Sequence, residues 1–343
     1  MKRRHLLLGV AGLAAGLTGL AVANQLTAFN LLVPKDAGSE VAAAGLAYGP
    51  GQRARLDIYR PLRAAGPLPV IVLFYGGAWD SGRRQDYAFA GRALAARGYL
   101  VVIPDYRVRP EVHFPDFLRD CAAAVRWVRA HAREHGADGE RIILSGHTAG
   151  AYNAAMLALD PQWLGPDRAA VRGFVGLATP ADFLPLDDPA SIATFSRWPR
   201  LEETQPIHFA AAGTPPVLLL HGDGDERVRP RNSQHLKAAL DRAGDEAELR
   251  LYAGVDHVRI LLALSRPLRG SVPVLDDIDR FARRVTAAGT AAGGANRGPE
   301  PCARSRCVNR SSAPDRPGTE GGRAGRRPAR DGTRASGVRN HPT

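Results

Sequence analysis

The 343-residue sequence predicts an α/β fold, in which helices cover both faces of a mostly parallel sheet. Two observations support this prediction. Short apolar runs, many of them rich in β-branched residues, alternate along the chain with stretches of helical periodicity. Hydrophobic residues make up 45% of the sequence, which is enough material for a large core. The alternation stops near both ends of the chain, so we expect one folded domain over residues 45–288.

The first 23 residues predict a signal peptide or a membrane anchor. A basic start precedes an apolar stretch, residues 6–23, that ends in small residues of the kind signal peptidases accept. The same stretch is also just long enough for an uncleaved anchor, so both alternatives stay open. We therefore expect export to the periplasm or medium, or membrane association through the N-terminus. Residues 24–44 contain chain breakers and are expected to form a connector.

The strands of the domain are expected where apolar runs are short and bounded by turn residues, and the helices where one face is apolar. In the helix over residues 116–135, Phe117, Cys121 and Val125 share the apolar face. Cys121 is thus expected to be buried, and a disulfide framework is excluded because the other two cysteines lie in the C-terminal tail. In chain order the elements are strands at 55–59, 70–75 and 100–104, helices at 87–97 and 116–135, strands at 142–144, 174–177, 217–221 and 248–252, and a helix at 275–285.

The pattern of strands and helices lapses over residues 178–216, which are rich in proline and aspartate. An insertion of this kind near the ends of strands usually builds part of a binding pocket, and the alternative is a plain surface loop. We expect a pocket-forming insertion.

Residues 289–343 are expected to be a disordered basic tail. From residue 287 onward the sequence has no Leu, Ile, Phe, Met, Trp or Tyr, so it cannot bury enough apolar surface to offset the entropy of ordering. Eleven arginines and four acidic residues give residues 291–343 a charge of +7, and the first five residues add +3. Only about +2 of the total of +12 belongs to the rest of the chain, so no nucleic-acid partner is expected for the folded domain.

The sequence RIILSGHTAGAYNAAML, residues 141–157, predicts a sharp turn from a buried strand into a helix. Gly146 and Gly150 stand two positions before and after Thr148, which is the spacing of a nucleophile elbow. Such an elbow lifts one hydroxyl above the edge of the sheet. Here the hydroxyl belongs to a threonine, and His147 beside it is expected in the wall of the pocket.

Ester hydrolysis needs an activated hydroxyl, a base, a group that orients the base, and donors for the developing oxyanion. His257 and Asp225, each after a later strand, fit the base and its orienting acid. Asp223, two residues earlier, is the alternative acid. The fourth requirement, free backbone N–H groups, favours glycine.

The turn after the strand at residues 70–75 meets this requirement. In Tyr75-Gly76-Gly77-Ala78-Trp79, the N–H groups of Gly76 and Gly77 are expected to form an oxyanion hole together with the N–H of Ala149. Trp79 is expected to line the substrate pocket or to pack under the turn.

These motifs resemble those of the feruloyl-esterase-like and hormone-sensitive-lipase-like carboxylesterases of bacteria. FYGGAW resembles the H-G-G-x-W oxyanion turn of that group with Tyr75 in place of histidine, and GHTAGAYNA resembles its GHSAGAYNA elbow. IPDYR, HGDGD and GVDH fit its strand end, acid and histidine segments. The resemblance covers residues 45–288. It implies an α/β-hydrolase fold and hydrolysis of a small-molecule ester without cofactor or metal.

The resemblance also implies roles for individual residues. Thr148, Asp225 and His257 take the catalytic positions, and Tyr75, with Trp79 and His147, belongs to the pocket. Threonine keeps the hydroxyl, but the elbow backbone is strained for a β-branched residue, at a cost of about 1–3 kcal/mol. Its methyl group also restricts χ1 and occupies space that the acyl carbon needs. We therefore expect a weakened esterase, and the alternative is a catalytically inactive relative that uses the pocket for binding.

One further pattern points to a different chemistry. His131, Glu134 and His135 match the H-x-x-E-H motif of some zinc peptidases. The motif ends an arginine-rich helix with no third ligand in view, so we expect no metal site. The sequence contains no phosphate-binding loop and no dinucleotide fingerprint, so no cofactor is expected.

Overall fold

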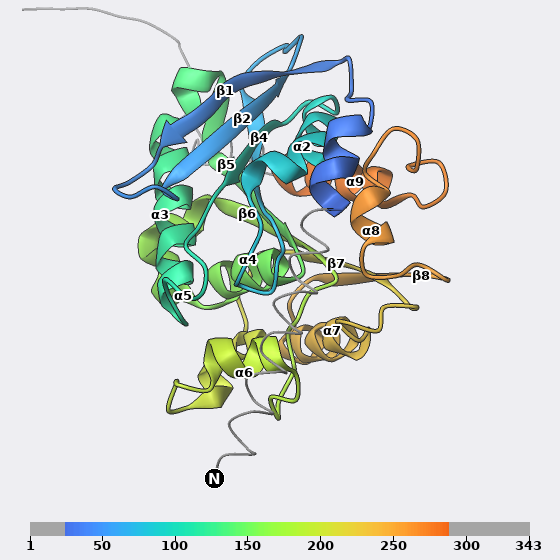
Figure 1. The fold of residues 1–343 in the computed structure, drawn as a ribbon. Helices are drawn as coiled ribbons and strands as arrows, with labels where there is room; N and C mark the ends of the chain where they lie inside the picture. The colour runs from blue at the N-terminus through green and yellow to red at the C-terminus, as the bar shows by residue number, and fades with distance from the viewer. Residues whose placement is uncertain (1–24, 288–343) are drawn as a thin grey trace, which may run out of the picture. The chain divides into compact units, whose positions relative to one another are not determined.

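A computed structural model of the chain describes residues 25–287, all within the first of the two units into which the chain divides, residues 1–295. Eight strands form one sheet in the order β1-β2-β4-β3-β5-β6-β7-β8 (Figure 1). The expected signal segment, residues 1–23, and the expected tail, residues 289–343, lie outside the described residues. Among the helices that are described, none is long and apolar enough to span a bilayer.

The sheet is mostly parallel, as the sequence predicts. Strands β3 to β8 run parallel to one another, and β2 is antiparallel to both of its neighbours. Val70, Ile71 and Val72 are consecutive and all buried, which is the pattern of a strand covered on both faces. The strands are β1 (Ser39–Ala47), β2 (Arg55–Pro61), β3 (Leu68–Phe74), β4 (Leu100–Pro104), β5 (Ala137–His147), β6 (Val171–Leu177), β7 (Val217–Gly222) and β8 (Ala247–Tyr252).

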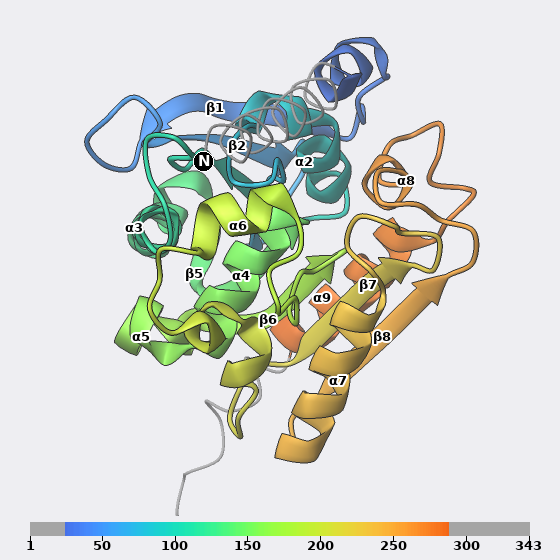
Figure 2. The ribbon, with the colours of Figure 1, turned by 60° about the horizontal axis from the view of Figure 1, so that its bottom comes forward.

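Helices cover both faces of this sheet. Helices α2 and α9 lie on one face, and α3, α4 and α7 lie on the other (Figures 1 and 2). Every residue of α4 is buried, because its small side chains let it pack at the centre against β5 and β6. The helices are α2 (Ala88–Ala95), α3 (Asp116–His131), α4 (Ala149–Leu159), α5 (Pro161–Leu164), α6 (Pro189–Phe195), α7 (Arg231–Ala243), α8 (Arg259–Leu262) and α9 (Val274–Ala287), with 3-10 turns η1 (Arg84–Tyr87), η2 (Ala132–His135), η3 (Gly165–Ala170), η4 (Leu201–Thr204) and η5 (Pro206–Phe209).

The structure corrects the prediction for residues 24–44, which were expected to be a connector. Residues 25–32 are helical, and β1 begins at Ser39 and pairs with β2. Phe29 meets the ring of Phe89 edge-on at 5.2 Å, so this segment packs onto the domain. The prediction failed because β1 is an alanine-rich edge strand with register shifts, and neither feature leaves an alternating apolar pattern.

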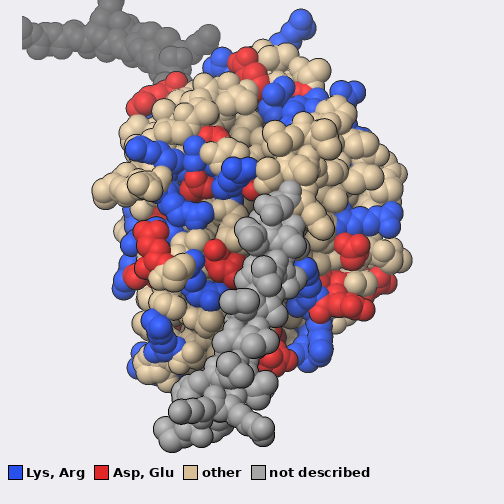
Figure 3. Space-filling model, in the orientation of Figure 1, with Lys and Arg blue, Asp and Glu red and all other residues tan. Residues whose placement is uncertain are grey.

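The surface seen in Figure 3 carries basic and acidic side chains interspersed with uncharged ones. Many charges of the described residues form ion pairs, such as Arg97 with Asp276 at 2.6 Å and Arg129 with Asp167 at 2.7 Å. Attraction to a nucleic-acid backbone requires unneutralised positive charge, and paired arginines supply little of it.

Candidate active site

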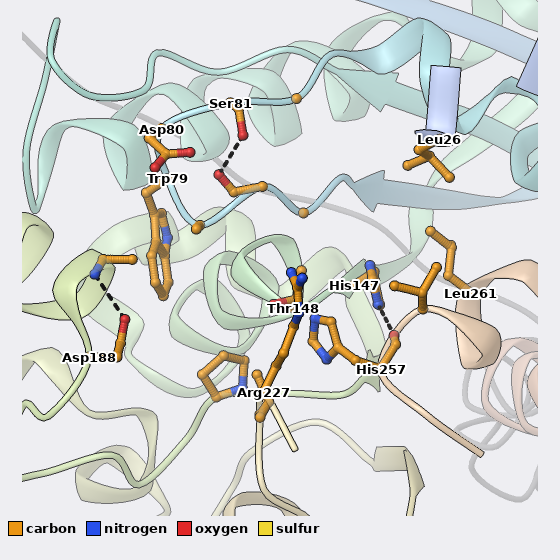
Figure 4. Close-up of a pocket in the computed structure, with 18 of the residues that line it drawn as sticks. Leu26, Trp79, Asp80, Ser81, His147, Thr148, Asp188, Arg227, His257 and Leu261 are labelled. Atoms are coloured by element: carbon orange, nitrogen blue, oxygen red, sulfur yellow. Dashed lines mark hydrogen bonds between the residues drawn. The ribbon is translucent and has the colours of Figure 1, made fainter. Parts of the chain in front are cut away.

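The predicted site residues come together at the carboxyl edge of the sheet. Thr148 follows β5, Asp225 follows β7 and His257 follows β8, while the Gly76–Trp79 turn (residues 76–79) follows β3. Because these strands run parallel in one sheet, their carboxyl ends open onto the same edge. Loops after all four strands line a pocket of about 780 Å³ (Figure 4).

Thr148 adopts the strained backbone of an elbow, with φ 49° and ψ −118°. The two flanking positions must be glycine, because neighbouring backbone atoms come too close to leave room for a Cβ. A Cβ on Gly146 would lie 2.3 Å from the Gly150 carbonyl, and one on Gly150 would lie 2.1 Å from the Phe74 oxygen. The Thr148 N–H donates to the Leu177 oxygen at 3.0 Å, which ties the elbow to β6. The turn that the G-x-T-x-G spacing predicts is thus present.

The extra methyl group of Thr148 lies against the turn after β3. A Cβ built on Gly76 would be only 2.1 Å from Thr148 Cγ2. A serine would leave this space open, next to the turn that the sequence predicts to form the oxyanion hole. No hydrogen bond joins the Thr148 hydroxyl to His257 among residues 25–287, although both side chains line the pocket. Catalytic hydrogen bonds are often long before substrate binds.

Asp225 and His257 form a buried acid–base pair. His257 Nδ1 donates to Asp225 Oδ2 at 2.7 Å, and Asp225 Oδ1 accepts from the N–H groups of Arg227 and Val228, both at 2.9 Å. Burial alone would raise the pKa of Asp225, but hydrogen bonds from His221 and His257 outweigh it and hold that pKa well below its usual range. The carboxylate is therefore ionised and keeps the Nδ1 proton on His257, which leaves Nε2 free to act as a base.

The neighbouring candidates have structural roles. Asp223 Oδ1 accepts from the Gly254 N–H at 2.7 Å, and Asp223 makes no contact with His257 that would orient it. His221 is buried and bonds to Ser233 Oγ and the Val228 oxygen, both at 2.7 Å, and its Nε2 also lies 3.5 Å from Asp225 Oδ2. Of the two aspartates considered for the orienting role, it is Asp225 that bonds to His257.

The predicted oxyanion turn, residues 75–79, differs from the prediction in two of its N–H groups. The N–H of Gly76 was expected to be free, but it donates to Tyr87 Oη at 2.9 Å. The N–H groups of Gly77, Ala78 and Ala149 have no acceptor among the described residues. Ala78 was missed by the sequence analysis. Its positive φ of 51° resembles that of a glycine, and nothing in the local sequence marks it.

Tyr75 was expected to line the pocket, and this prediction is wrong. The side chain is fully buried and stacks on Tyr106 with ring centroids 4.6 Å apart, and it does not contribute to the pocket. The large ring supports the turn from beneath. Trp79 does line the pocket, and its Nε1 donates to Asn153 Oδ1 at 3.2 Å.

A buried hydrogen-bond chain links the oxyanion turn to the His257 loop. His147 Nε2 lies 2.9 Å from the His257 carbonyl oxygen, which can only accept, so this nitrogen carries the proton. Burial, followed by repulsion from His257, lowers the pKa of His147 to about 3, so the ring is neutral. Its Nδ1 therefore accepts from Tyr87 Oη at 3.0 Å, and Tyr87 in turn accepts from Gly76. Tyr87 was also missed by the sequence analysis, because it stands where only a helix start was visible.

Because the pKa of His147 is low, the free energy of unfolding should depend on pH. Below about pH 6.5 the unfolded chain binds a proton at this residue and the folded protein does not, so stability should fall as the pH drops toward 3. The slope is about 1.4 kcal/mol per pH unit. His147→Gln removes this titration. We expect the advantage of the wild type over the variant, measured by urea unfolding, to shrink between pH 7 and pH 4.5.

The exposed His208 supplies the matched control. His208→Gln also removes one histidine, at an exposed position, and so controls for the loss of a histidine as such. A constant difference between the wild type and His147→Gln over the same range would contradict a buried neutral His147.

One side of the pocket is formed by apolar side chains. In Figure 4, Leu26 and Leu261 lie on one side of the two histidines, and Trp79 and Asp188 lie on the other. The helical residues 25–32 contribute Leu26, although sequence analysis placed them outside the domain. From the segment 178–216 come the lining residues Pro180, Phe183, Asp187, Asp188, Ala190 and Ser191.

No group of three or more His, Cys, Asp or Glu side chains within residues 25–287 is arranged to hold a metal ion. In the H-x-x-E-H pattern, His131 stacks on Trp127 with ring centroids 4.4 Å apart, and its Nδ1 bonds to the Trp127 oxygen at 2.8 Å. These contacts satisfy His131 as a helix-end residue.

Residues 56–240 match the family model described as BD-FAE, which is more than half of the chain. The chain belongs to the BD-FAE family. This BD-FAE chain is 26% identical to a solved structure of Thermogutta terrifontis esterase 2, with a TM-score of 0.61 over 74% of this chain and 96% of that one. A solved esterase B from Lactobacillus rhamnosis is 19% identical with a TM-score of 0.72, over 82% of this chain and 99% of that one. The predicted α/β-hydrolase fold and the resemblance to the carboxylesterase group are thereby confirmed.

Curated relatives of this BD-FAE chain also carry esterase names. The isoprenylcysteine alpha-carbonyl methylesterase ICME of Arabidopsis thaliana is 30% identical over 70% of this chain and 62% of that protein. Esterase LipC of Mycobacterium tuberculosis is 32% identical over 52% of this chain and 50% of that protein. The chain thus spans about half to three fifths of the length of these relatives.

Proposed function

We propose that this protein is a carboxylic-ester hydrolase that acts on a small acyl ester through a nucleophile, a histidine and an aspartate. The observation that carries the proposal is the 2.7 Å hydrogen bond between His257 and Asp225, in a pocket that also holds the Thr148 hydroxyl. The esterase names of the relatives agree with this chemistry.

In the proposed reaction, Thr148 Oγ1 attacks the ester carbonyl while His257 Nε2 takes its proton. Asp225 stabilises the resulting imidazolium. The N–H groups of Gly77, Ala78 and Ala149 are the candidates to bind the oxyanion. His257 then donates its proton to the departing alcohol, and water, activated by the same histidine, releases the acid.

The Thr148 methyl group favours a second candidate function. It lies against Gly76, and the hydroxyl makes no hydrogen bond to His257 within residues 25–287. A protein with this arrangement could bind an ester or acid in the pocket without cleaving it.

A fluorophosphonate probe separates the two candidates, since it reacts only with an activated hydroxyl. We expect slow labelling of the wild type at residue 148, fast labelling of Thr148→Ser and none of Thr148→Ala, with the site read by peptide mass spectrometry. Failure to label either the wild type or Thr148→Ser at high probe concentration would contradict the hydrolase and favour the binding protein.

We also propose that residues 6–23 direct export of the protein or anchor it in a membrane, so that it acts outside the cytoplasm or at the membrane. The basic start and apolar stretch of the sequence support this. Fractionation of cells that express the full chain should find it in the membrane, the periplasm or the medium. Recovery from the cytoplasm alone would contradict the proposal.

A further inference from the structure

The loop after β7 and the first residue of α7 present three arginines to the pocket. Arg227, Arg229 and Arg231 all contribute to its lining. Figure 4 shows Arg227 extending from this loop into the pocket, in the direction of Thr148. The loop that carries the catalytic acid thus also supplies cationic groups near the reacting hydroxyl.

Hydrogen bonds hold the backbone of this loop in place, and this fixes the position of the Arg227 Cα atom. Asp225 Oδ1 accepts from the N–H groups of Arg227 and Val228, and the Val228 oxygen bonds to the buried His221 at 2.7 Å. A side chain on an anchored backbone loses less freedom when it binds a ligand.

The guanidinium of Arg227 is free to bind a ligand. Its side chain is exposed and has no ion pair or hydrogen bond with any other described residue. Arg229 and Arg231 also make no ion pair among the described residues, whereas two acidic residues of the lining are already paired, Asp80 with Arg109 and Asp86 with Arg83.

The acidic residues of the pocket do not neutralise the Arg227 guanidinium by forming an ion pair with it. Asp188 accepts from the Ala190 and Ser191 N–H groups at the start of α6, and it lies on the Trp79 side of the pocket in Figure 4. Asp187 and Glu226 line the pocket without an ion pair among the described residues. The three arginines and the unpaired acidic residues of the lining thus leave the pocket near neutral as a whole. Which substrate charge the pocket prefers is then decided by contact with Arg227 at short range.

We propose that Arg227 binds an anionic group of the substrate, so that the site prefers esters with a carboxylate near the ester bond over neutral esters of the same shape. This inference rests on the proposed hydrolase function for its substrate role. A guanidinium binds a carboxylate through charge-assisted hydrogen bonds, and such bonds are about twice as strong as neutral ones. The apolar side of the pocket, with Leu26 and Leu261, takes the uncharged part of the ester.

The test compares two esters of matched shape in the wild type and in Thr148→Ser. The monoester methyl succinate carries a carboxylate where methyl levulinate carries a neutral ketone, and methoxide is too poor a leaving group for the substrate's own carboxylate to expel it. We expect kcat/KM to be about tenfold higher for the succinate, since hydrogen bonds to charged groups are the stronger kind. Arg227→Gln should remove this preference, because kcat/KM for the succinate should fall toward the value for the levulinate. Added salt should weaken the preference in the parent enzymes.

Arg63→Gln is the matched control, because Arg63 is an exposed loop arginine outside the pocket. It should leave both esters unaffected. Equal losses for the two esters in Arg227→Gln, or no preference for the succinate in the parent enzymes, would overturn the proposal.

A binding measurement keeps the inference separate from catalysis. N-phenylsuccinamic acid is an amide that this chemistry cleaves poorly, and its neutral counterpart is N-phenyl-4-oxopentanamide. Calorimetry should show tighter binding of the acid by the wild type and loss of that difference in Arg227→Gln. If no ester is cleaved but this difference appears, the hydrolase fails and the anion site stands. If esters are cleaved but neither assay shows a charge preference, the anion site fails alone.

Discussion

Thr148→Ser should raise kcat/KM for short 4-nitrophenyl esters on the order of 10²-fold, because loss of one oxyanion donor costs about 10²–10³ in comparable sites. The methyl group that the change removes faces Gly76, where a Cβ would lie 2.1 Å from it. Serine keeps the attacking oxygen and frees the space beside the N–H groups of Gly77 and Ala78. Steady-state hydrolysis of the acetate and butyrate esters measures the effect.

Two further variants make this result specific. Thr148→Val keeps the branched shape without the hydroxyl, and it should be inactive. Thr214→Ser lies outside the pocket and keeps the hydroxyl that bonds to Asp245 at 2.7 Å, so it should leave turnover unchanged. Equal activity of the wild type and Thr148→Ser would show that the methyl group does not obstruct the reaction.

Asp225→Asn, introduced into the Thr148→Ser enzyme, should lower kcat about 10⁴-fold, as loss of the orienting carboxylate does in a comparable triad. The asparagine oxygen can still accept from the Arg227 and Val228 N–H groups, so its amide nitrogen is left facing His257 Nδ1. Because an amide nitrogen can only donate, His257 Nδ1 must then accept, and the ring proton moves to Nε2. A protonated Nε2 cannot take the proton of the nucleophile. Initial rates with a saturating ester measure the loss.

Asp223→Asn is the control for this change, because its amide oxygen can keep the bond from the Gly254 N–H. Its turnover should stay within about twofold, as for most surface substitutions. Thermal unfolding of both variants shows whether the fold is retained. If Asp223→Asn abolished activity and Asp225→Asn did not, the acid would have to be reassigned.

The elbow could be predicted because the features that produce it are local. Gly146 and Gly150 are needed where the backbone turns back on itself, and their spacing around Thr148 is visible in a few residues of sequence. The oxyanion turn was predicted only in part. Tyr75 and Gly76 stand at the expected positions, but their partners are Tyr106 and Tyr87, which come 31 and 11 residues later.

The N-terminal boundary of the domain shows a second limit of sequence reasoning. Residues 25–32 pack through Phe29 against Phe89, 60 residues away, and bring Leu26 into the pocket. The segment is too short and too mixed in composition for its periodicity to reveal a buried face. Its membership of the domain depends on a partner surface that forms only when α2 is in place.

The sequence by itself determined the mostly parallel sheet, the order of the elbow, acid and histidine segments, and the threonine at the centre of the elbow, because each of these is encoded in neighbouring residues. The tertiary structure decided which N–H groups are free, that Tyr75 is buried beneath the turn, that His147 joins Tyr87 to the His257 loop, and that Arg227 enters the pocket. The physical reason is that hydrogen-bond satisfaction and burial depend on which distant residues meet. His147 and His257, 110 positions apart, are brought into contact only by the packing of parallel strands.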